Sequence, residues 1–289
     1  MSNEFAMPIY LDTTTLLDIL GSIEDGFSMS NNVTTVSSST KNRELSGKGG
    51  IDIPLLGLRL GGTAKKEKGS EASEERTSDR KYTYGSLLNQ LRKSLRDKNL
   101  LTQIKDPQAW LQVNYPDFVE VTGTFKRNPV VNIVSSYDGA HKLNREIRKR
   151  AGNPLDDSSN ALVEEQLEFD KWLINEAEDP RSRVYVVELS QPKDHRVIVS
   201  LYTDFLRDQI GNELDNGYFT LLGKVYRKVT APESIDLLEK SSLKAVDDSV
   251  IQSFFESFKD IERKGIKVPE WSRHVQAPAM TVIPIAVYI

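Results

Sequence analysis

Asp12 stands out near the start of the chain, because it lies between the apolar stretch PIYL and the apolar run TTTLLDIL. A carboxylate that ends a strand is a suitable ligand for Mg²⁺ or Mn²⁺, although such a hard cation needs several oxygen ligands brought together. No later predicted strand ends in an Asp that would face Asp12. The same side chain is a favourable N-cap for a helix that we expect to end at Gly26. The cap accounts for Asp12, so the sequence predicts no metal site.

The second group with potential chemistry is the basic stretch HKLNREIRKR, which predicts a short helix over residues 141–150. Its positive side chains could bind phosphate or an acidic partner. No aromatic residue is interleaved to stack on a base, and Leu143 and Ile147 are expected to supply a buried edge, so a solvated helix face is the preferred interpretation. The candidate anion-binding residues are Lys142, Arg145, Arg148, Lys149 and Arg150.

The composition of the 289 residues limits which kinds of catalytic, metal-binding and nucleic-acid-binding sites the chain can form. The chain has no Cys, which excludes disulfides and Cys-based zinc sites, and its three His are far apart in the sequence. Paired carboxylates such as Asp247 and Asp248 lie at predicted helix starts, where negative charge suits the helix dipole, and none has a companion that suggests a catalytic triad. The net charge of −4 argues against wholesale binding of nucleic acid. We therefore expect no cofactor and a role that is not enzymatic.

The elements that must position such residues are organised around the C-terminal half of the chain. This half contains a predicted strand pair, VYVVEL and RVIVSLY, followed by the glycine-centred segment GYFTLLGKVYRKV. The final run MTVIPIAVYI has no charge and many β-branched residues, which predicts a strand buried on both faces. The expected fold class is α+β, with a mixed, largely antiparallel sheet, packed helices and a long low-complexity insert near the N-terminus.

Amphipathic patterns predict several helices around this sheet. An acidic helix that begins at Ser158 or Ser159 is expected to run to about residue 178, with Leu162 and Trp172 among the apolar residues of its buried side. The other predicted helices cover residues 84–101, residues 203–214 and the run that begins at Asp247 or Asp248.

The segment DFVEVTGTFKRNPVVNIV alternates in polarity and predicts a strand, a turn and a second strand. Its first part, FVEVTGTFKR, aligns with YFTLLGKVYR around Gly123 and Gly223. Gly inside a strand marks a bulge or a close backbone approach, so we expect the same constraint at both positions. A true internal duplication is one interpretation, and two unrelated β segments with the same need are the other.

Residues 28–81 differ from the rest of the chain, because they contain no aromatic residue and have ten Lys or Arg against seven Asp or Glu. Such a composition is typical of a disordered loop or of a long functional one. A mobile or partly docked surface loop is the default interpretation of the glycine-bracketed island GGIDIPLLGLRLGG within it, and strand donation or partner binding comes second. Insertion of residues 45–65 into a membrane is less favoured, since the flanks of the island do not alternate. The candidate interaction residues are Ile51, Ile53, Leu55, Leu56, Leu58 and Leu60.

These patterns divide the chain into four predicted parts. The N-terminus lacks the pattern of a secretory signal, and no apolar run approaches the ~20 residues of a membrane-spanning helix. We therefore expect a cytoplasmic protein that does not associate with membranes. The predicted parts are a strand–helix start at residues 1–27, the insert at 28–82, an α+β layer at 83–180 and a C-terminal sheet domain at 181–289.

Several of these segments together resemble an uncharacterised family of bacterial domains. They are the start IYLDTTTLLDILGSIEDGF, the Gly/Ser-rich insert, the pair GYFTLLGKVYRKV and ESIDLLEKSSL, and the end APAMTVIPIAVYI, and FVEVTGTF fits as well. The resemblance covers nearly the whole chain and implies no reaction or catalytic residue. The kind of family suggests a role in bacterial conflict or antiviral systems.

The start IYLDTTTLLDIL also resembles that of PIN-like ribonucleases, in which Asp12 would match the first metal-binding carboxylate. The chain departs from that pattern after the first helix, because the insert replaces the expected compact alternation of strands and helices. We therefore weigh three hypotheses. The preferred one is an assembly or regulatory protein that binds a protein partner or itself through residues 28–82. The alternatives are a metal-dependent ribonuclease that uses Asp12 and a membrane-inserting effector. Nucleic acid is a weakly supported partner.

Overall fold

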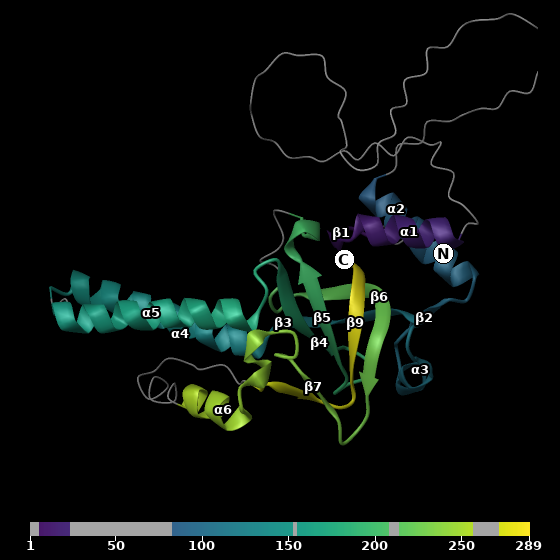
Figure 1. Cartoon of the computed structure of the whole chain (residues 1–289). Helices are drawn as coiled ribbons and strands as arrows, with labels where there is room; N and C mark the ends of the chain where they lie inside the picture. The colour runs from purple at the N-terminus through teal and green to yellow at the C-terminus, as the bar shows by residue number, and fades with distance from the viewer. Residues whose placement is uncertain (1–5, 24–82, 153–154, 208–213, 257–271) are drawn as a thin grey trace, which may run out of the picture. The chain divides into compact units, whose positions relative to one another are not determined.

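The computed structural model describes residues 6–23, 83–152, 155–207, 214–256 and 272–289. Met1–Phe27 and Tyr84–Ile289 together form one compact unit, called the first unit below. The fold described below is that of the first unit (Figure 1).

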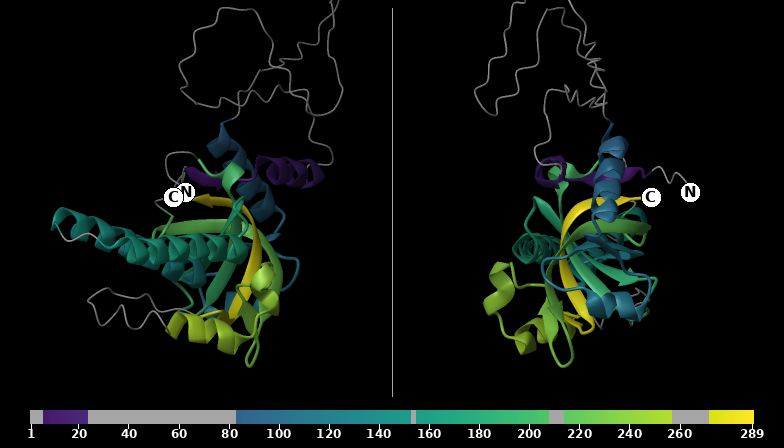
Figure 2. Two further views of the ribbon diagram at one scale, coloured as in Figure 1. Left: turned by 60° about the vertical axis from the view of Figure 1, so that its left-hand side comes forward. Right: turned by 90° about the vertical axis from the view of Figure 1, so that its right-hand side faces the viewer.

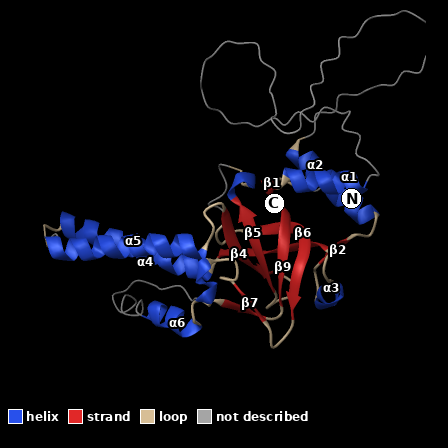
Figure 3. Cartoon of the chain, in the orientation of Figure 1, coloured by secondary structure: helices blue, strands red, loops and turns tan. Residues whose placement is uncertain are grey.

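Seven strands form one mixed sheet, and five of them close into a ring in the order β3, β4, β5, β9, β6 (Figure 3). Most neighbours are antiparallel, while β2 on β3 and β5 on β9 are parallel. The predicted α+β class with a mixed, largely antiparallel sheet is confirmed. The strands are β1 (Pro8–Leu11), β2 (Leu101–Gln103), β3 (Phe118–Arg127), β4 (Ser182–Leu189), β5 (Arg196–Tyr202), β6 (Tyr218–Val229) and β9 (Ala279–Tyr288). A separate two-stranded sheet pairs β7 (Ser234–Asp236) with β8 (His274–Gln276).

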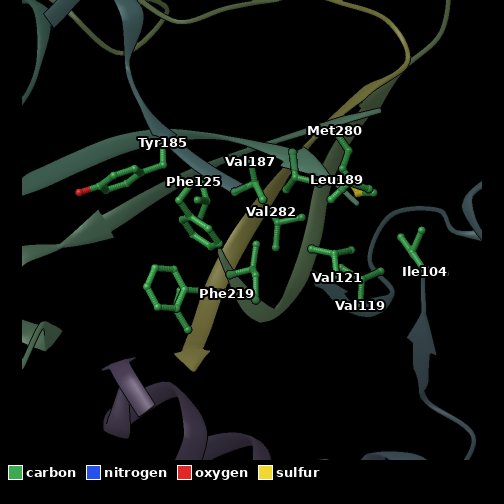
Figure 4. Close-up of a cluster of buried hydrophobic side chains, with 14 of the residues drawn as sticks. Ile104, Val119, Val121, Phe125, Tyr185, Val187, Leu189, Phe219, Met280 and Val282 are labelled. Carbon is green, nitrogen blue, oxygen red and sulfur yellow. The ribbon is translucent and has the colours of Figure 1, made fainter. Parts of the chain in front are cut away.

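The core lies inside the ring, where apolar side chains from the five strands meet (Figure 4). The last strand, β9, pairs with β1, β5 and β6 and is buried along most of its length, as its uncharged sequence predicts. The strands of the ring come from both the predicted 83–180 layer and the predicted 181–289 domain. The two regions therefore share one core.

The two similar glycine-centred segments are β3 and β6, and they pair with each other. Val121 lies opposite Leu221 at the middle of the pair, and each glycine lies opposite an apolar residue of the other strand. A Cβ on Gly123 would come within 2.2 Å of the Glu188 carbonyl oxygen, and one on Gly223 within 2.4 Å of the Ile283 carbonyl oxygen. The expected close backbone approach is present at both positions.

Six α-helices are described, and one of them, α4, corrects the sequence analysis. The predicted second strand PVVNIV is the start of a 22-residue helix, α4, so the basic helix is much longer than residues 141–150. Asn128 caps this helix by accepting a hydrogen bond from the Val130 N–H at 3.0 Å, and Pro129 occupies its first turn, where a missing N–H costs nothing. The helices are α1 (Thr13–Ile23), α2 (Tyr84–Asp97), α3 (Pro107–Gln112), α4 (Pro129–Arg150), α5 (Asp157–Ala177) and α6 (Asp248–Glu256).

The second correction concerns the helix predicted over residues 203–214. Only a 3₁₀ turn at Thr203–Phe205 forms there, and residues 208–213 lie outside the described residues. Leu206 instead makes an antiparallel bridge to Tyr10 of β1, and this pairing draws the backbone into an extended conformation. A second 3₁₀ turn covers Ser242–Ala245.

Candidate interaction surface

The most distinctive surface feature is a hairpin of the two long helices α4 and α5, which lie side by side and project from the sheet (Figures 1 and 2). They contain 22 and 21 residues, so each is roughly 30 Å long at ~1.5 Å per residue. The base of the hairpin is packed: Ile133 of α4 and Leu173 of α5 belong to one buried cluster with Leu243 and Ile251 from the 3₁₀ turn and α6. The hairpin is thus anchored at one end.

Glu178 ties the base of the hairpin to the sheet. Its carboxylate accepts hydrogen bonds from Arg127 Nη2 of β3, at 3.2 Å, and from the backbone N–H of Val184 in β4. Burial raises the pKa of Glu178 above its ordinary value, although these hydrogen bonds and the Arg127 charge oppose the shift. The end of α5 is therefore fixed by polar contacts as well as by packing.

The packed side of the hairpin continues outward as an exposed apolar surface. Ile147 follows Ile133 by fourteen residues, and Phe169 and Leu162 precede Leu173 by four and eleven residues. These spacings are close to whole turns of an α-helix, so the exposed residues share the side of Ile133 and Leu173. That side is covered at the base by the 3₁₀ turn and α6.

We name five exposed side chains of this region the hairpin face. Phe169 and Trp172 contact each other, with ring centroids 5.5 Å apart. Single exposed apolar residues are ordinary, but several gathered on two neighbouring helices mark an interaction site. The exposed fractions are 62% for Leu143, 56% for Ile147, 66% for Leu162, 42% for Phe169 and 49% for Trp172.

The candidate anion-binding residues all lie on the outer half of α4, and the hairpin itself already uses some of them. Lys142 forms an ion pair with Asp138 at 2.6 Å, Arg145 pairs with Glu164 of α5, and Arg148 donates to Asn144. Lys149 and Arg150 are exposed at the end of the helix. Anion binding by this group stays a prediction.

Asp12 acts as a helix cap. Its carboxylate accepts hydrogen bonds from the Thr15 N–H at 2.9 Å and the Thr15 hydroxyl at 2.7 Å, so both oxygens have a local donor. Among the described residues, no group of three or more His, Cys, Asp or Glu is arranged to hold a metal ion. The described part of the chain therefore offers the ribonuclease hypothesis no such cluster around Asp12.

The most buried acidic group of the sheet is Glu120, which lies in a network of donors. Arg92 Nε and the Tyr288 hydroxyl donate to one carboxylate oxygen at 2.9 and 2.8 Å, and Arg96 and Gln103 donate to the other. Burial by itself would raise the pKa of Glu120, but the hydrogen bond and charge of Arg92 outweigh it and hold the pKa below its ordinary value. This network joins α2 to β3 and β9.

A second network surrounds Arg273, just before β8. Its guanidinium donates to both oxygens of Asp236 at 2.9 and 2.8 Å, to Asp248 at 2.7 Å and to two backbone carbonyls. His274 contacts the other oxygen of Asp248 at 2.9 Å. Because carboxylates and carbonyls surround this guanidinium, it links β7, β8 and the start of α6.

The insert residues singled out from the sequence, Ile51 to Leu60, lie outside the described residues, as does the whole of 45–65. No helix in the described part of the chain combines the length and apolar character needed to cross a membrane. The structure therefore leaves the insert hypotheses as predictions.

Sequence reasoning missed the hairpin face, because it placed Leu162 and Trp172 on the buried side of their helix. The structure buries Leu167 and Leu173 there and leaves Leu162 and Trp172 exposed. The same reasoning placed Leu143 and Ile147 on a buried edge, whereas they are 62% and 56% exposed. The available signal was the width of the apolar side, because Leu162, Phe169 and Trp172 extend the side of Leu173 around the helix. An apolar side this wide exceeds what the other helix of the hairpin covers.

Comparisons with known proteins complete the description. No curated protein and no solved structure matches the chain. One family model, described as a domain of unknown function (DUF6414), matches residues 5–288. The match spans β1 to β9 and agrees with the resemblance to an uncharacterised family. The chain therefore belongs to the DUF6414 family.

Proposed function

We propose that the protein acts through protein–protein contact, as a cytoplasmic assembly or regulatory protein, and that the hairpin face is its contact surface. The observation that carries this proposal is the exposed apolar group on α4 and α5, which includes two aromatic rings in contact. Aromatic residues are enriched in the centres of protein interfaces, where they bury large areas at a small entropic cost.

The use of the ionisable groups also supports a role in contact. Glu120 and Arg273 are buried and bound within networks that join elements, and Asp12 caps α1. These groups therefore have structural roles in the first unit, which serves as a scaffold for the hairpin.

The test compares native complexes from cells of the source organism. A variant that carries both Leu162→Lys and Phe169→Lys should migrate at the size of the 32.6 kDa monomer, whereas the wild-type chain migrates in a larger complex. Charged side chains on the face cannot enter an apolar contact without a large desolvation cost.

Leu111→Lys provides the matched control, because Leu111 is 65% exposed on α3 and lies outside the hairpin. This control should leave the complex unchanged. A double variant that migrates with the wild type would refute the hairpin face as the contact surface.

A further inference from the structure

We infer that the occupant of the hairpin face is a second copy of this chain, bound so that two hairpins form a four-helix bundle. This inference rests on the proposed function and specifies its partner. In the arrangement, α4 of each copy lies on α5 of the other, and the apolar side chains of both faces meet in the middle. A two-fold axis makes both contacts equivalent.

The charges of the two helices select this partner and this pairing. The outer half of α4, residues 141–150, has five Lys or Arg and one Glu, whereas α5 has six Asp or Glu and one Lys. A contact of α4 with α4, or of α5 with α5, would bring like charges together. A contact of α4 with the α5 of another copy brings opposite charges together at the rim of an apolar centre.

Within one hairpin only part of this complementarity is used. Arg145 pairs with Glu164 across the two helices, while Lys149, Arg150, Glu165 and Glu168 are exposed. By helical spacing, Arg150 lies beside Ile147 on α4, and Glu165 and Glu168 lie beside Phe169 and Trp172 on α5, whereas Lys149 lies on the far side of α4. A partner hairpin of the same sequence therefore offers an acidic rim for α4 and a basic rim for α5.

The dimensions of the hairpin also suit a second copy. The two helices differ by one residue in length, and they project from the sheet (Figures 1 and 2). Stable interfaces bury about 800 Å² on each partner. The outer half of the hairpin presents five large apolar side chains to such a contact over about 15 Å of each helix, because the 3₁₀ turn and α6 cover its base.

Paired charge reversals in the purified full-length chain test the inference. One variant carries Arg150→Glu, and the other carries Glu165→Lys and Glu168→Lys. All three residues are exposed, so each variant should fold and melt as the wild type does. Sedimentation velocity should show a wild-type dimer, and each variant alone should have a dissociation constant raised about tenfold or more.

An equimolar mixture of the two variants should restore the dimer, because each basic rim again meets an acidic one. The inference would be overturned if a charge-reversal variant alone dimerised as tightly as the wild type. It would also be overturned if the mixture of the two variants did not restore the dimer. A wild-type chain that is monomeric at every concentration would also overturn it. If Leu162→Lys/Phe169→Lys still dissolves the native complex in that case, the proposed function stands with another protein as partner. If that double variant leaves the native complex intact, both the four-helix bundle and the proposed function are wrong.

Discussion

At the scale of single residues, the two glycines of the paired strands show most directly how sequence dictates structure. Gly123 and Gly223 lie where the carbonyl groups of the neighbouring strands approach closest. The sequence indicated a shared constraint at both positions, and the fold explains it, since β3 and β6 occupy neighbouring places in the same ring. The structure gives a physical reason for the similarity without deciding its origin.

We predict that Gly123→Ala and Gly223→Ala each lower the free energy of unfolding by about 2–3 kcal/mol, because the added methyl group meets backbone atoms that cannot move independently. Gly139→Ala is the control: it lies inside α4 with nothing within 4 Å of the new Cβ, so it should stabilise the protein by about 0.5–1 kcal/mol. Urea unfolding curves measure all three. Equal effects at the three positions would contradict the close approach.

Glu120 predicts a dependence of stability on pH. Its pKa is lower in the folded chain than in the unfolded chain, so the unfolded state binds more protons as the pH falls. The stabilisation from Glu120 is therefore fully present above the unfolded pKa of about 4.3 and is lost as the pH falls through the folded pKa. Glu120→Gln should remove this contribution and lower stability at pH 7 by about 3 kcal/mol, because Arg92 remains buried without its charge partner.

The control for this prediction is Glu188→Gln. Glu188 forms an ion pair with Lys126 at 2.7 Å, but its side chain is 44% exposed. An exposed pair contributes at most about 1 kcal/mol, so the change in stability should be small. Thermal melts at pH 7 and at pH 4 would show the difference, and the Glu120→Gln protein should lose less stability than the wild type on acidification.

At the scale of elements, the sequence predicted strands better than it predicted α4. The run PVVNIV is rich in β-branched residues, which favour strands locally. The segment nevertheless forms a helix, because Asn128 caps it and Pro129 occupies its first turn. Four of its apolar residues are also buried in the cluster shared with other helices: Val130, Val131, Ile133 and Val134. The packing of these residues therefore outweighs their local preference for a strand, and the sequence alone does not reveal that packing.

The hairpin predicts two different responses to truncation of its apolar residues. Leu173→Ala should lower the free energy of unfolding by about 2–3 kcal/mol, because Leu173 is buried in the cluster at the base. Leu162→Ala should change it by less than about 0.5 kcal/mol, because that side chain is exposed in the single chain. The measurement is unfolding of the dilute protein, in which any association is absent. A large loss for Leu162→Ala would mean that the face is covered within the chain itself.

At the scale of the whole molecule, closure of the ring could not be predicted from the sequence. It depends on the contact of β3 with β6 and of β5 with β9, which join residues far apart in the chain. The fold class and the position of the last strand followed from charge and alternation alone. The hairpin face could not be predicted in this way, because its exposure depends on which side of α5 the other elements cover.

The proposed dimer predicts a dependence on salt that a purely apolar contact lacks. Raising the ionic strength shortens the screening length from about 10 Å at 0.1 M to about 3 Å at 1 M, which weakens the attraction between the charged rims. The dissociation constant of the wild-type protein should therefore rise several-fold, as measured by sedimentation at the two salt concentrations. Association that strengthens with salt would show that the charges oppose it.

The most direct test of the central claim, that the hairpin face contacts protein, is photo-cross-linking in living cells of the source organism. A photoreactive amino acid at position 162 should yield a covalent protein adduct, whereas the same group at position 111, which is equally exposed on α3, should yield none. An adduct with a second copy of the chain would also support the four-helix arrangement. No adduct at position 162, or equal adducts at both positions, would contradict the claim.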